Sequence, residues 1–472
     1  MVKITILGGK NEIGGNKILV EHEDTRVFLD FGMSFNHNSS FFSEYLNPRK
    51  CAALGDFFEF GLLPEMNGIY RTDYLEHMGL PSEECSIDAV FLSHAHADHV
   101  QHVHFLRWDI PIYCSEATKI IMDCVQKTST GSFIDLTNAC ESFRYYENTK
   151  GGQSRVNRQI AKKKTEYLHD RNFEIMEPYN RINVGSLDVE MIPVDHSLPG
   201  ACGYIIYTNQ GNIVYTGDIR FHGSNGNLSE KFVKKAKAAS PKWLICEGTR
   251  IDSNEKNSEK EVEQEISKII ADAEGLVFVE HPIRDIDRVN SILEASKAND
   301  RIFAVPPKLA YLIEALGKNC PFTLDDVEIL VPPKSWGLIA KEDISPELIT
   351  KDYKWENDII SEYDYITFKD LIKNPDKYVV SMSMWEVGQL VDIQPKKAIW
   401  IKSSCEPFSD EMLLDDERKK HWLEHFGIEE FSAHASGHAS GNEIRAMIKE
   451  IGAEMVIPVH TEHPDMLNIG GE

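Results

Sequence analysis

The sequence contains neither a long apolar run nor a closely spaced pair of cysteines. No apolar run is long enough to cross a bilayer, and the first residues, Met1–Leu7, resemble a strand rather than a signal peptide. The nine cysteines are an odd number and include no Cys-x-x-Cys pair, which argues against a disulfide framework. We therefore expect a reduced, cytoplasmic protein with no membrane partner.

Basic residues are also scarce. The chain has 50 lysines and arginines against 75 aspartates and glutamates, a formal net charge of -25. Because nucleic-acid binders usually carry a basic face, this balance argues against a polyanionic substrate, although bound dications or a local basic cluster can reverse the charge of one cleft. The most basic region, 130–179, is interpreted as a solvated helix, with a substrate flap as the alternative. Its cations are Arg155, Arg158, Lys162, Lys163, Lys164 and Arg171.

What is present is a β-rich beginning and end around an α/β middle. A chain of 472 residues with 42% hydrophobic residues is long enough for two domains, or for one domain with an insertion. Apolar runs and alternation predict strands at 3–7, 17–21, 25–30, 89–93, 187–192, 203–207, 213–216, 276–280, 301–305, 378–383, 398–402 and 454–459. Helices are predicted at 115–128, 259–273, 286–298, 308–318 and 442–451. The alternation after residue 259 is typical of an α/β unit with a parallel sheet.

A histidine-rich loop follows one of the predicted strands. The six residues from His94 to His99 carry four metal-competent side chains, and they come directly after the strand at 89–93. Imidazole binds Zn, Mn or Fe, and a carboxylate beside it favours a hydrolytic over a structural site. The alternative is a polar loop that is merely rich in histidine. We interpret the loop as half of a metal site; its candidate ligands are His94, His96, Asp98 and His99.

Three more strand ends carry candidate ligands. His196, Asp218 and His460 each follow an apolar strand, and such positions gather at one edge of a sheet. Taken alone, each is more often a surface residue, but together with the histidine loop they predict one shared metal site. Asp30, also at a strand end, is either a hydrogen-bond partner of a ligating histidine or an ordinary turn residue.

With these motifs in this order, the chain resembles the metallo-β-lactamase superfamily. Two further motifs narrow the resemblance to the β-CASP nucleases: Cys246–Arg250, before the α/β segment, and Phe431–Ser440, followed by Pro458–Glu462. The His-x-Ser-Gly-His pattern and the opening Gly8–Asn16 are most like the ribonuclease J group. With histidine at position 460, the chain resembles the RNA-processing branch of the family, since the DNA-repair members typically have another residue there.

The resemblance implies the α/β fold class, an αββα metallo-β-lactamase sandwich with an inserted α/β (β-CASP) domain on a parallel sheet. We expect residues 1–250 to form the first part of the sandwich, 251–425 the β-CASP domain, and 426–472 the part that completes the sandwich. The chain departs from the group in longer segments at 33–86 and 130–180, and in Thr461-Glu462, where Gly-Glu is usual. We also expect no C-terminal domain after Glu472.

The resemblance also assigns roles to these residues. It implies that His94, His96 and His196 hold one divalent ion, that Asp98, His99 and His460 hold a second, and that Asp218 bridges the two. Zinc is the expected metal, and manganese suits the same ligands. The catalytic set is Asp98, Asp218, His438 as general acid and Glu247, which we expect to hydrogen-bond a ligating histidine. Phosphate is expected at His434, Ser436, Gly437 and His438, near a helix start.

These assignments predict a metal-dependent ribonuclease that hydrolyses single-stranded RNA through a metal-bridging hydroxide. The sequence leaves cleavage from a 5′ end and internal cleavage both open, and a homodimer is compatible with it. One alternative is a small-molecule hydrolase acting on an ester, lactone or thioester, which the acidic charge favours. Another is an inactive RNA-binding or scaffold relative, which the full set of seven ligands disfavours.

Overall fold

Two six-stranded sheets lie face to face and carry the site at one edge. The computed structural model describes residues 1–43, 45–144, 147–150, 153–156, 165–255, 257–405 and 410–467. The first sheet has the order β1 (Lys3–Gly8), β2 (Lys17–His22), β3 (Thr25–Leu29), β4 (Ala89–Phe91), β5 (Ile112–Cys114) and β10 (Phe173–Ile175). The second has the order β11 (Arg181–Val184), β12 (Leu187–Pro193), β13 (Cys202–Tyr207), β14 (Asn212–Tyr215), β15 (Pro241–Glu247) and β23 (Met455–Val459).

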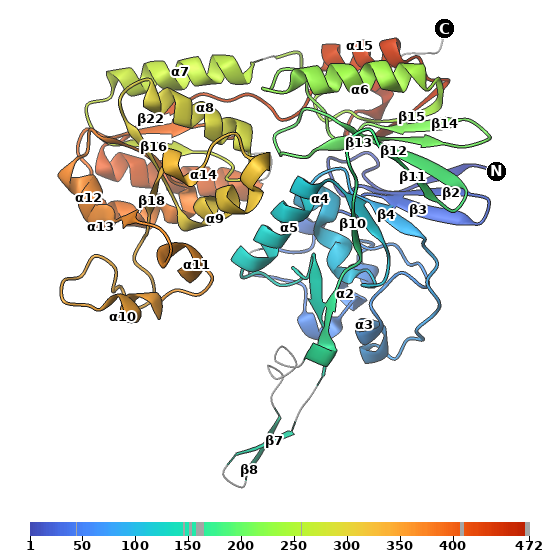
Figure 1. Ribbon diagram of the computed structural model, residues 1–472, viewed down its shortest axis with the longest axis horizontal. Coiled ribbons are helices and arrows are strands. Elements are labelled where there is room, and N and C mark those ends of the chain that lie inside the picture. The colour runs from blue at the N-terminus through green and yellow to red at the C-terminus, as the bar shows by residue number, and fades with distance from the viewer. Residues whose placement is uncertain are drawn as a thin grey trace.

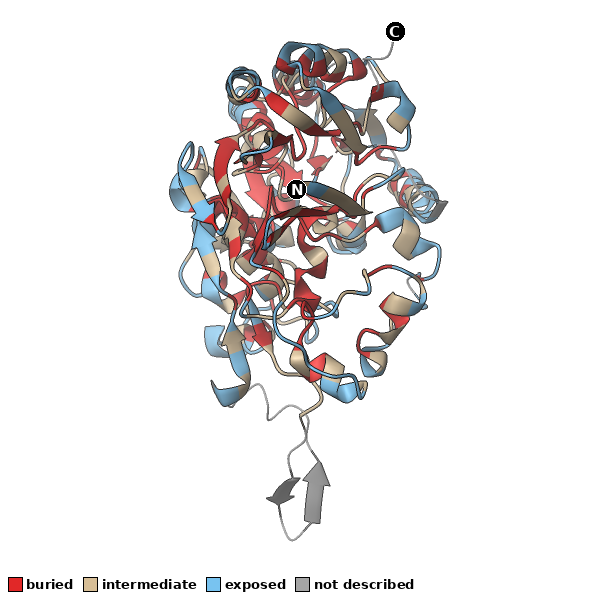
Figure 2. Cartoon of the chain, turned by 90° about the vertical axis from the view of Figure 1, so that its right-hand side faces the viewer, coloured by how far each residue is buried: buried red, intermediate tan, exposed pale blue. Residues whose placement is uncertain are grey.

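The space between the two sheets is filled by the side chains that alternation assigns to their inner faces. Ile18 and Val27 from the first sheet share one core with Val189 and Tyr204 from the second. On the outside, α5 (Glu116–Thr128) packs on the first sheet, and α6 (Gly226–Ala238) and α15 (Gly441–Ile451) pack on the second. The predicted αββα sandwich is therefore confirmed, and Figure 2 shows its strands as the most buried part of the molecule.

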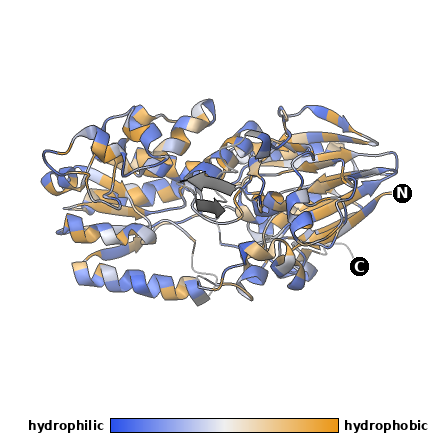
Figure 3. Ribbon diagram, turned by 90° about the horizontal axis from the view of Figure 1, so that it is seen from below, coloured by the Kyte–Doolittle hydropathy of each residue, from blue (hydrophilic) through white to orange (hydrophobic). Residues whose placement is uncertain are grey.

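A second lobe is inserted between β15 and β23 (Figure 1). Its seven-stranded sheet is parallel throughout, in the order β19 (Tyr365–Ile366), β18 (Glu328–Leu330), β17 (Ile302–Val305), β20 (Tyr378–Ser381), β16 (Val277–Glu280), β21 (Ile399–Lys402) and β22 (Glu429–Ser432). One face is covered by α7 (Glu259–Asp272), α8 (Ile286–Lys297) and α9 (Pro307–Leu316), the other by α12 (Phe368–Lys373), α13 (Leu390–Ile393) and α14 (Asp410–Phe426). Apolar residues line the strands of both lobes in Figure 3.

Short elements complete the chain. They are α1 (Phe35–Ser39), α2 (Gly55–Glu59), α3 (Thr72–His77), α4 (Ala97–Val100), α10 (Pro346–Thr350), α11 (Asn357–Ile360) and the strand pairs β6 (Asn138–Cys140) with β9 (Leu168–Asp170) and β7 (Glu147–Lys150) with β8 (Gln153–Val156). The nine cysteines, all within the described residues, form no disulfide bond. In the same residues, no helix combines the length and apolarity that crossing a membrane requires.

One expectation about secondary structure is wrong, and one long helix was not predicted. The interpretation of 130–179 as a solvated helix fails, because its described part forms strands, and Arg171 is buried with its guanidinium donating to the backbone carbonyls of His104 and Leu106. The flap alternative concerns Arg158 and Lys162–Lys164, which lie outside the described residues, and Arg155, whose side chain is not described. Helix α14 was not predicted, because its sequence lacks a single apolar stripe: Leu423 is buried, but Leu413 and Leu414 are exposed.

We expect Trp400→Ala to destabilise the inserted lobe strongly. Trp400 is fully buried in β21, and its indole N–H donates to Glu280 Oε2 at 3.1 Å, so truncation leaves a large cavity and costs about 3–5 kcal/mol. Urea unfolding measures the loss. The matched control is Trp336→Ala, because Trp336 is 59% exposed and its truncation should change stability by less than about 0.5 kcal/mol. Equal unfolding midpoints for the two variants would contradict this account of the core.

Candidate dinuclear metal site

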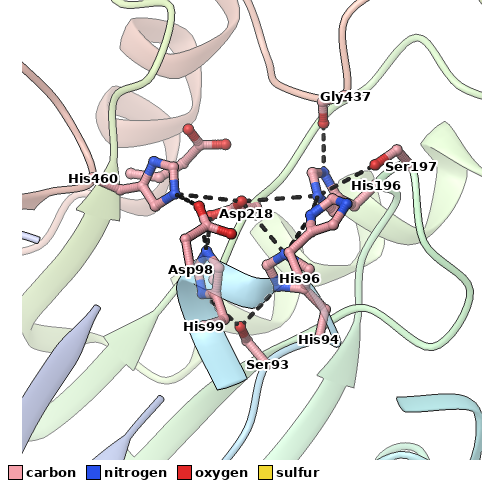
Figure 4. Close-up of polar contacts among 12 residues, drawn as sticks. Ser93, His94, His96, Asp98, His99, His196, Ser197, Asp218, Gly437 and His460 are labelled. Atoms are coloured by element: carbon pink, nitrogen blue, oxygen red, sulfur yellow. Dashed lines mark hydrogen bonds and ion pairs between the residues drawn. The ribbon is translucent and has the colours of Figure 1, made fainter. Parts of the chain in front are cut away.

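The seven predicted ligands come together at one edge of the sandwich (Figure 4). The histidine loop leaves β4 and continues into the short helix α4, while the other three ligands follow β12, β14 and β23. These strands belong to both sheets, and their ends meet at the same edge. The fold therefore brings residues more than 350 positions apart in sequence, such as Asp98 and His460, into contact.

One group of ligand atoms comes from His94, His96, His196 and Asp218, which all lie within 4.8 Å of one another. His96 Nδ1 is 3.0 Å from His94 Nε2 and 3.1 Å from His196 Nε2. Asp218 Oδ2 is 3.5 Å from His94 Nε2. Three imidazoles and a carboxylate at this spacing can hold a divalent ion.

A second group comes from Asp98, His99 and His460, also within 4.8 Å of one another. His460 Nε2 is 3.1 Å from Asp98 Oδ2. Asp218 reaches this group as well, since its Oδ1 is 3.3 Å from His99 Nε2 and its Oδ2 is 3.7 Å from His460 Nε2. Asp218 therefore touches both groups, which is the position that a bridging ligand needs.

Two buried atoms in this cluster have no hydrogen-bond partner among the described residues: His99 Nε2 and Asp218 Oδ1. Buried polar atoms without partners are costly, and those in native proteins usually have a ligand, ion or water. Both atoms are good ligand atoms for zinc or another divalent metal. The donor set therefore fits bound cations.

The ionisation of the site favours cation binding. Burial lowers the pKa of His96 to about 3 and lowers the pKa values of His94 and His196, so these imidazoles stay neutral and keep a lone pair for a metal. Burial alone would raise the pKa of Asp218, but the surrounding histidines hold that pKa well below its usual range. Burial alone would also lower the pKa values of His99 and His460, but the carboxylates of Asp218 and Asp98 outweigh it and raise both. A cation bound there would have to displace a proton from these two rings.

Behind the ligands, several hydrogen bonds fix the orientation of the histidine rings. Asp30, buried and with a positive φ of 57°, places Oδ2 at 2.7 Å from His99 Nδ1. Of its two predicted interpretations, the structure therefore supports the partner of a ligating histidine. The Ser93 hydroxyl and the Tyr215 phenol both donate to Asp30, at 2.7 and 2.6 Å. Neither contact was predicted, because Ser93 and Tyr215 lie 63 and 185 positions from Asp30 in the sequence.

Glu247 contacts a different histidine from the kind that was predicted. Its two oxygens lie 3.1 and 3.2 Å from His438 Nδ1, so it contacts the candidate acid rather than a ligating histidine. It reaches His460 only through Thr249, whose hydroxyl donates to Glu247 Oε2 at 2.7 Å and lies 2.9 Å from His460 Nδ1. Burial alone would lower the pKa of His438, but the carboxylates of Glu247 and Asp218 outweigh it and raise the pKa to about 9.

The expected phosphate-binding segment is already occupied by internal hydrogen bonds. The His438 N–H donates to Ser436 Oγ at 3.1 Å, and the Gly437 carbonyl lies 2.6 Å from His196 Nδ1. The helix after this segment starts only at Gly441 and is capped by its own side chains. His434 Nδ1 accepts from Arg288 at 3.1 Å. The segment thus orients His196 and His438, and the helix-start argument for phosphate binding fails.

Comparison with known proteins agrees with the resemblance drawn from the motifs. Residues 428–469 match the family described as "Zn-dependent metallo-hydrolase RNA specificity domain". The chain is 22% identical over 99% of its length to ribonuclease J of Mycoplasma genitalium, covering 69% of that protein, and 22% identical over 98% of its length to ribonuclease J of Helicobacter pylori J99, covering 56% of it.

Among solved structures, a protein of unknown function from Enterococcus faecalis V583 aligns with a TM-score of 0.71 and 23% identity, covering 99% of this chain and 96% of that one. This likeness concerns the fold alone. The predicted resemblance to ribonuclease J is confirmed by the sequence matches, and divalent metal use is supported by the matched family and by the ligand clusters.

We expect Gly14→Ala to reduce bound metal. Gly14 has a φ of 78°, and a Cβ there would lie 2.6 Å from Asp98 Cβ, so the new methyl group must displace a predicted ligand. Metal per chain, measured by atomic emission after dialysis, should fall. Gly79→Ala is the control, since Gly79 has a φ of 70° and nothing within 4 Å of the added atom. Equal metal content in both variants would show that Asp98 is not a ligand.

Proposed function

We propose that this chain, a ribonuclease J-like protein with a metallo-β-lactamase fold, is a metal-dependent ribonuclease that hydrolyses phosphodiester bonds of single-stranded RNA. The sequence matches to ribonuclease J and to the RNA specificity family support this class of enzyme. The observation that carries the proposal is the Glu247–His438 pair, which lies against the ligand cluster, with His438 Nδ1 3.1 Å from Glu247 Oε1 and 3.9 Å from Asp218 Oδ2. Phosphodiester hydrolysis needs such a donor for its leaving oxygen.

In this proposal the ligand cluster would hold two divalent ions, and zinc is the expected metal, with manganese as the alternative. The first ion would be held by His94, His96 and His196, and the second by Asp98, His99 and His460. Asp218 would contact both. Two such ions, when bound, acidify a shared water and stabilise charge on the phosphoryl oxygens. Asp30 and Thr249 support the ligands by fixing the rings of His99 and His460.

His438 supplies the proton for the leaving oxygen. Glu247 holds its Nδ1 from one side, which fixes the ring and leaves Nε2 as the atom that can deliver a proton. Without bound metal, the carboxylates of Glu247 and Asp218 outweigh burial and raise the pKa of this imidazole, and the contact with Glu247 favours its protonated form. Glu247 is itself fixed, since it also accepts from the backbone N–H of Ile219 at 2.9 Å, so the pair is held in one geometry before substrate arrives.

The proposal also covers the domain boundaries, the oligomeric state, the location and the mode of cleavage. The division into residues 1–250, 251–425 and 426–472 is proposed with its second boundary moved beyond 432, because β22 (Glu429–Ser432) pairs with β21 in the inserted sheet. A cytoplasmic location is proposed from the nine free cysteines, and a homodimer is compatible with the sequence. Cleavage from the 5′ end and internal cleavage both fit the site.

A 5′-labelled single-stranded RNA, incubated with and without a chelator, tests the activity. We expect cleavage that stops on chelation and returns with added zinc or manganese, because bound divalent ions would activate the water and supply most of the charge that stabilises the phosphoryl oxygens. Asp98→Ala serves as the inactive control. Mononucleotides released from one end indicate an exonuclease, and internal fragments an endonuclease. Intact RNA, with turnover of a lactone or thioester, would support the small-molecule hydrolase favoured by the acidic charge.

His438→Ala should retain its metal but lose turnover on RNA by about 10²- to 10⁴-fold, the usual contribution of a general acid. The metal should be retained because His438 is not one of the predicted ligands, and its Nδ1 contacts Glu247. Single-turnover cleavage and atomic emission measure the two properties on the same sample. His463→Ala is the control, because the His463 side chain is 50% exposed. Loss of metal in His438→Ala, or full turnover, would contradict the assigned role.

A further inference from the structure

The carboxyl ends of the parallel strands in the inserted sheet form one continuous edge. In the sheet, β20 lies between β17 and β16, so the segments that follow these three strands are neighbours. Open α/β sheets bind ligands in the crevice outside the carboxyl ends of their strands. This edge is therefore the first place in the lobe to search for a substrate contact.

Each of the three segments presents one side chain suited to single-stranded nucleic acid. Arg284 follows β16, Lys308 follows β17 in the first turn of α9, and Trp385 follows β20. Trp385 is 76% exposed, which is unfavourable for an indole unless it has a partner to cover it. It borders a hollow of about 150 Å³ whose lining includes two lysines and three acids: Lys402, Lys419, Glu280, Asp415 and Asp416.

Two cations on this edge are unpaired, whereas the nearby acids are not. Glu280 accepts from Lys419 at 2.9 Å, and Glu386 accepts from the Ser383 backbone N–H at 2.9 Å. Arg284 and Lys308, by contrast, form no hydrogen bond or ion pair within the part of the chain that the structure describes. Burial and the charge of Arg284 lower the pKa of Lys308, and Glu386 raises it, so Lys308 is within range of both charges.

This edge lies beside the ligand cluster. Asp287, three residues after Arg284, accepts a hydrogen bond from Arg220 at 2.7 Å, and Arg220 follows Asp218 by two residues. The helix that begins next, α8, also touches the site, because Arg288 donates to the Ala435 carbonyl at 3.0 Å, three residues before His438.

We propose that Arg284, Lys308 and Trp385 form a binding track for single-stranded RNA, in which the two cations contact successive phosphates and the indole stacks on a base. The inference rests on the proposed function and adds to it the part of the chain that holds the strand. It also accounts for RNA binding by a chain of net charge -25, because only the edge beside the metal site needs to be positive. Cationic grooves combined with aromatic platforms are how proteins hold single strands without reading their sequence.

Binding of a fluorescent single-stranded RNA with a phosphorothioate backbone, which resists hydrolysis, tests the track on the metal-loaded protein. Arg284→Gln and Lys308→Gln should each weaken binding and each reduce the slope of log affinity against log salt by about 0.7, the value for one phosphate contact on a single strand. Trp385→Ala should weaken binding by about tenfold without changing that slope. Trp385→Phe should restore most of the affinity while removing part of the tryptophan quenching on binding.

The matched controls are Lys373→Gln and Ile372→Ala on α12, which are exposed side chains of the same lobe and precede β20 rather than follow it. Wild-type affinity and salt slope in the three track variants would overturn the inference, even if the wild-type protein cleaves RNA. The predicted losses of binding, in a wild-type protein that cleaves no RNA, would support the track and contradict the proposed function. Equal losses in the α12 controls would show a general charge effect and also overturn the track.

Discussion

The structure depends on one costly arrangement, the burial of the Asp218 carboxylate among five imidazole rings. His94, His99, His196, His438 and His460 all lie within 4 Å of its oxygens. Buried charges persist only when they are paired or bind metal, and Asp218 Oδ1 still lacks a hydrogen-bond partner within the described residues. Divalent ions bound here would satisfy that oxygen and His99 Nε2 together, so the strand ends around Asp218 make physical sense as a metal site.

The same constraint explains how the two lobes are joined. Arg220, two residues after Asp218, donates to Glu259 at 3.2 Å, and Glu259 accepts from Arg288 of the inserted lobe at 2.8 Å. All three side chains are buried. Because Arg288 also donates to the Ala435 carbonyl, this network connects the segment after Asp218, the inserted lobe and the segment that carries His438. The insertion therefore helps to fix the position of His438.

The ligands were predictable from the sequence because each combines a metal-competent side chain with the end of an apolar strand. The partners behind them were not. Thr249 and Gly437 act through a hydroxyl and a carbonyl on His460 and His196, and neither residue type signals such a contact by itself. Glu247 was correctly placed near the site but was assigned the wrong histidine, because its distance from His438 depends on how β15 and the segment before α15 meet in space.

In the fold, too, some elements could be predicted from the sequence and others could not. Helices α7, α8 and α9 have clear apolar stripes and were predicted, whereas α14 is charged around most of its surface and is held mainly by Leu423 against the sheet. The seven-stranded order also lay beyond the sequence, and with it the neighbourhood of Arg284, Lys308 and Trp385. An element with a regular local pattern of apolar residues can be predicted from the sequence. Contacts that depend on the order of strands in a sheet can be identified only in the structure.

The central claim is that Asp218 bridges two metal ions. Anomalous diffraction at the absorption edge of zinc, on crystals of the zinc-loaded protein, tests it most directly. The account predicts two peaks about 3.5–4 Å apart, the separation typical of dinuclear hydrolases, with the Asp218 carboxylate between them. A single peak, or two peaks that Asp218 does not join, would contradict it.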